Sequence, residues 1–385
     1  MQGSRPCSTR SSSAQAKRVA LGCARARGKK RIGILTGGGD CPGLNAGIRA
    51  IAKTAILNYD MEVVGIKDGF LGLIENRFLP ISYEDVSGIL ALGGTFLGAS
   101  NKANPFRHPD PKGRFRDVSD MAVENYKAMG LDGLICIGGD GTLNIAYRLL
   151  KKGVRLVGVP KTIDNDLKQT DTTIGFDSAL ITTTQAIDKL HTTAQSHHRV
   201  MVIEVMGRYA GWLALYSGLA GGGDIILLPE IPYDIKKVCE VVLKRNQSGK
   251  RFSIVVVSEG ARPKAGKVVV RKMVKDSTDP VRLGGIGNKL ANDIENMTGL
   301  EARVTVLGHL QRGGEPSPFD RILATRFGVE ACKLTVKGDF GKVVVLKAGQ
   351  IRKVDLEKAV EDIKRVSLNE PVIDVARAVG ATFGI

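Results

Sequence analysis

The sequence predicts an α/β protein with two Rossmann-like, three-layer αβα domains whose sheets are largely parallel. Three observations lead to this expectation. Short apolar strands alternate with amphipathic helices along most of the chain. Turns that contain glycine follow the strands, as at the carboxyl edge of an open parallel sheet, where ligands bind. The chain has 385 residues, which exceeds the size of one typical core. We expect the active site in the cleft between the two domains.

The segments of the chain differ in composition and in the order of their expected elements. A hydrophobic content of 43% and an aromatic content of 5% are typical of a globular α/β protein. A basic segment without acidic residues precedes the first expected strand. We expect an N-terminal extension at 1–29, a first α/β domain at 30–175 that is completed by about 311–350, a second α/β domain at 176–310, and a C-terminal helical segment at 351–385.

The positive charge of the chain is concentrated near its beginning. The formal net charge is +17, yet the first acidic residue is Asp40, and residues 1–39 contain nine Lys or Arg. A Ser-, Arg- and Ala-rich segment of this kind resembles an organellar transit peptide. A disordered extension or a start codon placed too far upstream explains it equally well. We expect a cytoplasmic protein, with organellar targeting by the extension left open.

Composition also argues against several classes of function. No apolar run is long enough to span a bilayer, so no membrane association is expected. The six cysteines form no C-x-x-C pair, which is typical of buried thiols in a reducing compartment. The sequence contains no basic helix with interleaved aromatic residues, the pattern that would indicate a nucleic-acid partner. The positive charge outside the extension suits small polyanionic substrates.

The first expected structural unit is a strand at 31–36, a glycine turn and a helix at about 46–57. In the turn Gly37-Gly38-Gly39, backbone N–H groups and a helix N-terminus can approach a phosphate. Gly38 would lie nearest to such a ligand. Tight packing of the turn is the alternative explanation.

A strand at 62–66 comes next, and a glycine-rich loop at 93–106 follows it. The loop ends at a proline and contains too much glycine for a helix. Its Lys102 either contacts a nucleotide phosphate or lies as a solvated cation on the surface.

The central stretch predicts two neighbouring strands that end in reactive turns. A buried strand at 134–137 leads into Gly138-Gly139-Asp140-Gly141-Thr142 and a helix, and a second apolar strand spans 154–159. The glycines again suit a phosphate. Asp140 is placed to hold a divalent cation, because Mg²⁺ on phosphates is usually held by one or two protein carboxylates. A capped strand-to-helix turn without a ligand is the alternative.

The second of these strands runs into Pro160-Lys161-Thr162-Ile163-Asp164-Asn165-Asp166. Asp164 and Asp166 lie two apart, so in an extended segment they point the same way, with Thr162 on the same face. One carboxylate can then accept a hydroxyl proton while its neighbours hold the metal.

The second half of the chain repeats the alternation of helices and strands. Apolar residues at helical spacing predict one long helix at 175–195, and the change of domain falls near its start. A second parallel sheet explains the strands that follow. We expect these strands at 200–205, 225–228, 253–257 and 303–307, and after them a strand at 343–346 and an amphipathic helix at 355–366.

Cationic side chains lie next to the ends of the strands in this half. Guanidinium groups bind a phosphomonoester in bidentate fashion. Solvated surface arginines are the alternative for any one of them. We expect a phosphate pocket at one sheet edge from Arg199, Arg208, Arg303, His309 and Arg312.

From Lys30 to about Phe340 the chain resembles the 6-phosphofructokinases. Three blocks carry the resemblance, together with the turn Gly138–Thr142, which also occurs in NAD kinases and lipid kinases. The blocks are Pro160-Lys161-Thr162-Ile163-Asp164-Asn165-Asp166, Glu204-Val205-Met206-Gly207-Arg208-Tyr209-Ala210-Gly211 and Leu307-Gly308-His309-Leu310-Gln311-Arg312-Gly313-Gly314.

The resemblance implies transfer of the γ-phosphoryl group of ATP to the C1 hydroxyl of fructose 6-phosphate in glycolysis, with Mg²⁺ as cofactor. It implies that Asp164 is the general base, that Asp140 binds the metal with Asp166 nearby, and that Arg208 stabilises the transition state. It implies a nucleotide-binding first domain, with contacts to ATP from Gly38, Lys102, Gly139, Asp140, Gly141 and Thr142. It implies a second domain that binds the sugar phosphate, with substrate contacts from Thr162, Ile163, Asp164, Met206, Gly207, Arg208, Glu259, His309 and Arg312.

The resemblance also implies a homodimer or homotetramer with shared active sites, because Arg199 and Arg303 match arginines that reach into a neighbouring subunit. Two positions bear on the phosphoryl donor. Family members that use pyrophosphate typically have Asp in place of Gly141 and Lys at the position of Lys161, and some ATP-dependent members combine this glycine with this lysine. We predict ATP, because a carboxylate at 141 would repel the α-phosphate of a nucleotide and glycine leaves room for it. A pyrophosphate-dependent phosphofructokinase and a catalytically silent nucleotide-binding regulatory subunit are the alternatives.

Overall fold

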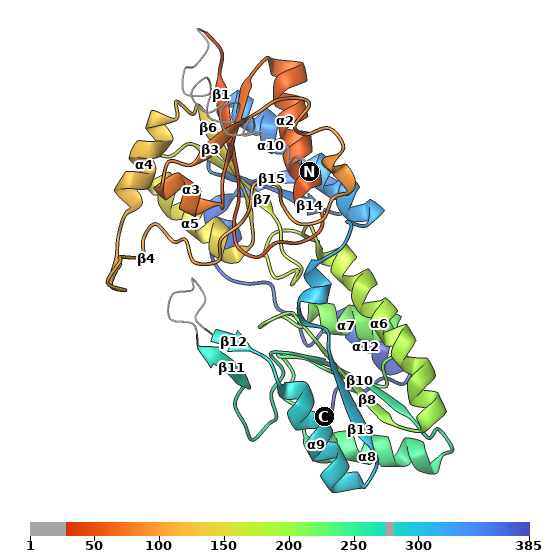
Figure 1. Ribbon diagram of the computed structural model, residues 1–385. Coiled ribbons are helices and arrows are strands. Elements are labelled where there is room, and N and C mark those ends of the chain that lie inside the picture. The colour runs from red at the N-terminus through yellow and green to blue at the C-terminus, as the bar shows by residue number, and fades with distance from the viewer. Residues whose placement is uncertain (1–27, 274–280) are drawn as a thin grey trace, which may run out of the picture.

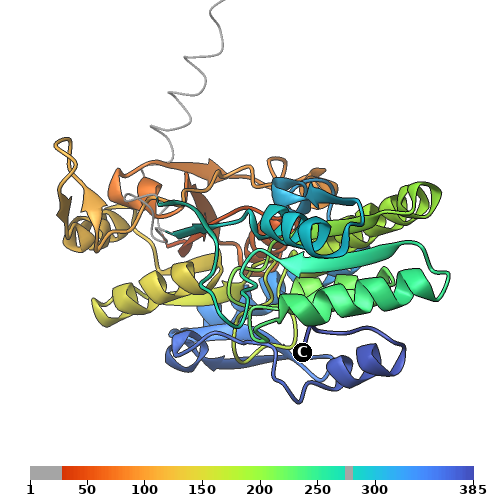
Figure 2. The same ribbon diagram turned by 90° about the horizontal axis from the view of Figure 1, so that it is seen from below.

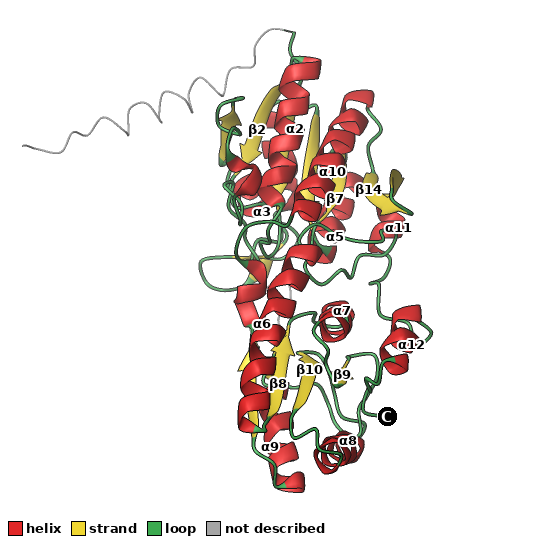
Figure 3. Cartoon of the chain, turned by 90° about the vertical axis from the view of Figure 1, so that its right-hand side faces the viewer, coloured by secondary structure: helices red, strands yellow, loops and turns green. Residues whose placement is uncertain are grey.

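Two separate sheets, one above the other, organise the computed structural model (Figure 1; Figure 3). It describes residues 28–273 and 281–385. The expected N-terminal extension therefore lies, except for its last two residues, outside the described part of the chain. Within that part, no helix is long and apolar enough to cross a membrane.

The first sheet has seven strands in the order β15-β14-β7-β6-β1-β2-β3. The five inner strands are parallel, and the edge strands β15 and β3 run antiparallel to their neighbours. The inner strands are almost wholly buried, as continuous apolar runs predict. The strands are β1 (Arg31–Thr36), β2 (Glu62–Ile66), β3 (Phe78–Ile81), β6 (Gly133–Gly138), β7 (Leu156–Pro160), β14 (Lys342–Lys347) and β15 (Gln350–Asp355).

Helices cover both faces of this sheet, because successive strand residues point to opposite sides. Ile34 and Ile135 face the core formed with α2 (Leu44–Tyr59) and α10 (Pro318–Lys337). Leu35 faces the core on the other side. The helices of that side are α3 (Phe70–Ile74), α4 (Ser119–Ala128), α5 (Asp140–Lys151) and α11 (Leu356–Val360).

The second sheet has four strands, all parallel, in the order β13-β8-β10-β9. Helices again lie on both faces, so each sheet is the middle of three layers (Figure 2). The strands are β8 (Val200–Val205), β9 (Ile225–Leu227), β10 (Ser253–Ser258) and β13 (Ala302–Val306). The helices are α6 (Phe176–His197), α7 (Trp212–Ala220) and α12 (Pro371–Ala378) on one face, and α8 (Ile235–Gln247) and α9 (Ile286–Thr298) on the other.

The predicted αβα architecture is confirmed, and short elements complete it. Two antiparallel hairpins project from the sheets. These are β4 (His108–Pro109) with β5 (Phe115–Arg116) and β11 (Val270–Met273) with β12 (Val281–Leu283), and there are 3₁₀ turns η1 (Ile89–Ala91) and η2 (Gly308–Arg312).

The amphipathic helix expected at 355–366 is present only in its first part, as α11 (Leu356–Val360). β15 pairs with β14 across a turn in which Gly349 has a φ of 76°, and α11 ends at Val360. β15 lies mostly in the segment 351–385, which the sequence predicts to be helical. It is an edge strand with a largely exposed face, so it carries few apolar residues and its charged pattern resembles a solvated helix.

The end of the chain returns to the second sheet. The N–H of Ile226 donates to the carbonyl of Thr382 over 2.8 Å, and that of Asp234 donates to Gly384, also over 2.8 Å. Residues 351–385 therefore add a strand to the first sheet and close the second, rather than forming only a helical segment.

Candidate active site

Three turns meet at the carboxyl edge of the first sheet, as the alternation of strands and glycines predicts. β6 lies between β1 and β7, and its last residue, Gly138, is paired with Pro160. The N–H of Gly37 donates to the carbonyl of Ile137 over 2.9 Å. The turns after β1, β6 and β7 are therefore side by side.

Glycines allow the turn after β1 and the turn after β6 to pack closely against each other. A Cβ on Gly37 would lie 2.5 Å from the side chain of Thr142, and one on Gly138 only 2.3 Å from it. Gly38 has a φ of 74°, which favours glycine. Gly141 differs, because no atom lies within 4 Å of the position of its missing Cβ. Close packing therefore explains Gly37 and Gly138, whereas Gly141 borders open space.

Lys161 is buried and ties the first turn to the third. Its Nζ donates to the carbonyl of Gly37 over 3.0 Å and to the carbonyl of Gly39. Burial lowers the pKa of this lysine. The ammonium group thus holds the backbone of the turn that carries Gly38 by hydrogen bonds on both sides of this glycine.

The segment that carries Asp164 and Asp166 is a turn, so the expectation of an extended segment is wrong. Asn165 between them has a φ of 51°, a left-handed conformation that a non-glycine residue adopts at some cost. Thr162 Oγ1 accepts a hydrogen bond from the N–H of Asp164 over 3.1 Å. The Oδ1 atoms of both aspartates are buried and have no hydrogen-bond partner.

Three carboxylates influence one another at this edge. The pKa of Asp166 is raised to about 7, first by burial and then by the charges of Asp164 and Asp140, while Arg208 opposes the rise. Burial also raises the pKa of Asp140, and Arg208 again opposes it. Because Arg208 follows β8, a cation of the second sheet faces the carboxylates of the first.

Arg208 and Glu259 form the opposite wall. The N–H of Arg208 donates to Glu259 Oε1 over 3.2 Å, and Arg208 has a left-handed φ of 51°. A Cβ on Gly260 would lie 1.7 Å from the carbonyl oxygen of Arg208, so only glycine allows this approach. The pKa of Glu259 is raised to about 7, first by burial and then by the charge of Asp164. Glu259 therefore lies near the predicted base.

The turn η2 brings Arg312 to the same place. Its Nη1 donates to the carbonyl of Asp40 over 3.1 Å, and its charge opposes the rise in the pKa of Glu259. Gln311 in the same turn accepts a hydrogen bond from the N–H of Met206 over 3.2 Å. His309 is exposed on this turn. Arg312 thus links the first glycine turn with the second sheet.

Arg199 and Arg303 do not join this group. They lie at the amino ends of β8 and β13, whose first residues are paired in parallel register. Arg199 forms an ion pair with Glu301 at 2.8 Å, and Arg303 with Glu295 at 3.2 Å. The expectation that all five cations lie at one edge is wrong for these two, because Arg199 directly precedes β8 and Arg303 is the second residue of β13.

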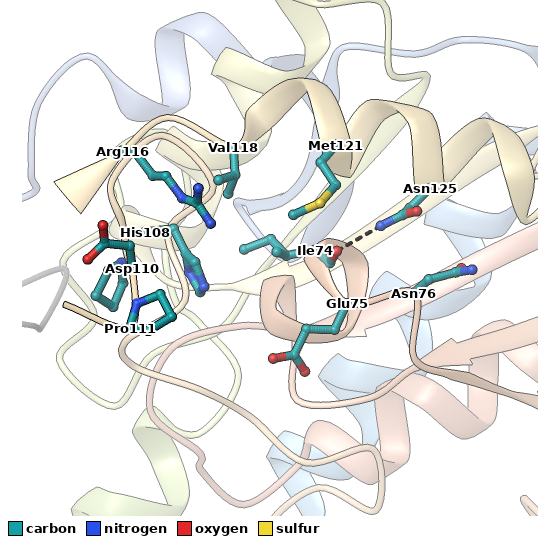
Figure 4. A pocket seen from close by; sticks show the side chains of 11 residues that line it. Ile74, Glu75, Asn76, His108, Asp110, Pro111, Arg116, Val118, Met121 and Asn125 are labelled. Atoms are coloured by element: carbon teal, nitrogen blue, oxygen red, sulfur yellow. Dashed lines mark hydrogen bonds between the residues drawn. The ribbon is translucent and has the colours of Figure 1, made fainter. Parts of the chain in front are cut away.

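Two cavities lie near the first sheet. One of about 550 Å³ is lined by Gly38, Asp40 and the loop at 92–101, and Lys102 is exposed just beyond it. The other, of about 680 Å³, lies between α3, α4 and the β4–β5 hairpin (Figure 4). None of the predicted site residues lines the second cavity.

The site carries more negative than positive charge on the side of the first sheet. Among residues 28–273 and 281–385, no three His, Cys, Asp or Glu side chains form a group that could hold a metal ion. One or two carboxylates suffice for Mg²⁺ on a phosphate. The buried, unpartnered Oδ1 atoms of Asp164 and Asp166 fit a divalent cation nearby.

One residue of the site region is missing from the sequence-based expectations. Lys364 donates from its Nζ to Asn165 Oδ1 over 3.1 Å. It lies in the segment that was expected to be helical, and nothing in the local pattern of residues indicates this contact.

Replacing Asp166 by Asn should stabilise the protein without ligand at about pH 8, by roughly 1–3 kcal/mol. Its pKa rises from 3.8 to about 7 on folding, so between these values the folded state keeps a proton that the unfolded chain has released. The free energy of unfolding that Asp166 contributes therefore falls as the pH rises through this range. Urea unfolding of both proteins at several pH values measures the difference, which should shrink towards about pH 4; a difference that grows as the pH falls would contradict the expectation.

Comparison with known proteins gives a consistent result. The profile of the family described as Phosphofructokinase matches residues 31–335. The chain is 54% identical to ATP-dependent 6-phosphofructokinase 2 of Clostridium perfringens, over 92% of this chain and 98% of that protein. It is 49% identical to a pyrophosphate–fructose 6-phosphate 1-phosphotransferase of Streptomyces coelicolor, over 92% and 100%. The crystal structure of Pichia pastoris phosphofructokinase in the T-state matches with a TM-score of 0.75 at 31% identity, over 92% of this chain and 37% of that longer chain.

Proposed function

The chain belongs to the phosphofructokinase family, and we propose that it is an ATP-dependent 6-phosphofructokinase. It transfers the γ-phosphoryl group of Mg-ATP to the C1 hydroxyl of fructose 6-phosphate, which yields fructose 1,6-bisphosphate and ADP. One observation carries the proposal. The unpartnered carboxylate of Asp164 lies beside two glycine turns and close enough to Glu259, on the other wall, to raise the pKa of that residue.

ATP binds along the carboxyl edge of the first sheet. The glycine turns offer backbone N–H groups to its phosphates. The cavity beside Gly38 and the open space at Gly141 support this placement. The contacts are made by Gly38, Lys102, Gly139, Gly141 and Thr142.

Asp140 would hold Mg²⁺, with Asp166 nearby. Bound there, it would neutralise charge on the phosphates of the donor. The raised pKa values of both residues support the assignment, because burial without a cation disfavours their charged forms.

Asp164 is the general base that takes the proton from the C1 hydroxyl. Its Oδ1 makes no hydrogen bond in the protein and is available as an acceptor. Thr162 Oγ1 accepts from the N–H of Asp164, which leaves the hydroxyl proton of Thr162 to donate to the transferred phosphoryl group. Arg208 faces the same carboxylates and offsets charge that develops on the phosphoryl group.

The sugar phosphate binds against the second sheet. Arg312 and His309 share one turn and would hold the 6-phosphate, while Glu259 accepts hydrogen bonds from sugar hydroxyls. The side chain of Ile163 is fully buried, so its contact with substrate is limited to its backbone. The remaining contacts are made by Thr162, Asp164, Met206, Gly207 and Arg208.

The protein functions as a homodimer or homotetramer with shared sites. Arg199 and Arg303 lie at the amino edge of the second sheet, away from the site of their own chain, which supports a role in a neighbouring subunit. Sedimentation analysis that gives a single chain per particle would contradict this assembly. We place the enzyme in the cytoplasm, which the buried free cysteines Cys41, Cys136, Cys239 and Cys332 support.

An assay of donors tests the function. Purified protein with fructose 6-phosphate should turn over with Mg-ATP and scarcely with Mg-pyrophosphate. A pyrophosphate-dependent enzyme is the second candidate, because Lys161 and the Streptomyces coelicolor relative favour it. The opposite preference would establish that candidate, and no turnover with either donor would indicate a silent subunit.

A further inference from the structure

A segment beyond the family match passes between the two halves of the site. We call residues 363–366 the C-terminal strap. The chain runs here from α11 beside the first sheet to α12 beside the second (Figure 3). Ile363 forms an antiparallel bridge with Leu167, and the N–H of Lys364 donates to the carbonyl of Asp166 over 2.6 Å. The strap thus lies against the turn that carries the predicted base.

The side chain of Lys364 is hydrogen-bonded to this turn and to the residues that follow it. Its Nζ donates to Asn165 Oδ1 over 3.1 Å, to the carbonyl of Thr170 over 3.0 Å and to the carbonyl of Asp171 over 2.9 Å. These three bonds use all the protons of the ammonium group. They hold Asn165, whose left-handed conformation sets the directions of the carboxylates on either side of it.

The other side of the strap holds the loop that follows β8. The carbonyl of Lys364 accepts the indole N–H of Trp212 over 2.8 Å. Glu230 Oε1 accepts from the N–H of Val366 and from the N–H of Gly211, each over 2.9 Å. Gly211 and Trp212 lie at the start of α7, three and four residues after Arg208. One short segment therefore contacts the loops from both walls.

We propose that Lys364 is a positioning residue for phosphoryl transfer, which fixes the turn of Asp164 and Asp166 relative to the loop that carries Arg208. The inference rests on the proposed function. Lys364 touches neither donor nor acceptor but sets the angle at which the base meets the hydroxyl. Small errors in such angles reduce the rate of the chemical step more than they reduce binding.

The test replaces Lys364 by Met, which keeps the length of the stem and removes the three hydrogen bonds. We expect kcat to fall roughly tenfold to hundredfold, with KM for ATP and for fructose 6-phosphate within about threefold of the parent. Lys364→Arg restores charge and donors and should recover much of kcat. Arg365→Met, at the exposed neighbouring position, is the matched control and should keep the parental kcat.

Trp212 is the single tryptophan of the chain and reports whether the strap stays in place. Lys364 Nζ lies 5.1 Å from the centroid of the indole ring, so loss of its charge by itself shifts the emission maximum, and quenching by acrylamide is the readout instead. In Lys364→Met this quenching should match the parent, because Trp212 is buried and the backbone bond to its indole remains. If this variant does not fold, Lys364→Gln, which keeps an amide donor, takes its place in the comparison.

A kcat within about twofold of the Arg365→Met control would overturn the inference. So would a loss of kcat that comes with stronger acrylamide quenching of Trp212 and is not recovered in Lys364→Arg, because that pattern indicates general loosening. A parent enzyme without activity towards fructose 6-phosphate would instead refute the proposed function, so the two failures are distinguishable.

Discussion

Asp164→Asn should lower kcat by about three to four orders of magnitude, which is near the upper end of the rate effect expected when a positioned general base is removed. The amide has nearly the shape of the carboxylate but cannot take the proton from the C1 hydroxyl. Binding of the donor should change little, because the glycine turns that we propose to contact ATP do not depend on this side chain. Asp164 has no protein hydrogen bond at Oδ1, so the substitution breaks no bond there.

Steady-state kinetics and equilibrium binding of Mg-ATP separate the chemical step from affinity. Asp374→Asn, on the exposed face of α12, is a matched control that should keep the parental kcat. If Asp164→Asn keeps its kcat and only KM rises, Asp164 is a binding residue and another group is the base.

Gly141→Asp should reduce kcat/KM for ATP by about a thousandfold, since juxtaposed like charges cost several kcal/mol. The fold has room for the new side chain, because no atom lies within 4 Å of the position of the missing Cβ. Its carboxylate would enter the space proposed for the α-phosphate of ATP. A loss of activity would therefore reflect repulsion of the donor rather than misfolding.

Gly141→Ala is the control for this substitution, because it fills part of the same space without charge. It should retain most of the activity with ATP, and both variants should melt near the parental temperature. Equal losses in the alanine and aspartate variants would show that space rather than charge matters at this position. Undiminished activity of Gly141→Asp would place the nucleotide elsewhere.

The carboxyl edge of the first sheet could be predicted because the information is local. Each glycine turn follows its strand directly, and parallel neighbours bring such turns together. The sequence could not show the conformation of Asn165, because this left-handed residue is hydrogen-bonded to Lys364, which lies far along the chain. The exposed strand β15 was missed for a related reason, since its pairing with β14 outweighs a charged pattern that suits a helix.

The arginines show a different limit. Arg199 precedes its strand and Arg208 follows the same strand, so their opposite ends could have been distinguished from their order. The role that we propose for Arg199 and Arg303 in a neighbouring chain comes from the resemblance to the family, because a pattern of residues alone does not show which surfaces meet.

The return of the last residues to both sheets affects how the protein is made. β14 and β15 join the first sheet, and Thr382 binds beside β9 in the second, so each half depends on residues that come after β13 in the chain. Until these later segments have been synthesised, both halves expose open strand edges, so folding during translation stops short of completion. A premature stop codon between β13 and β14 would leave two unfinished sheets and a target for chaperones and proteases.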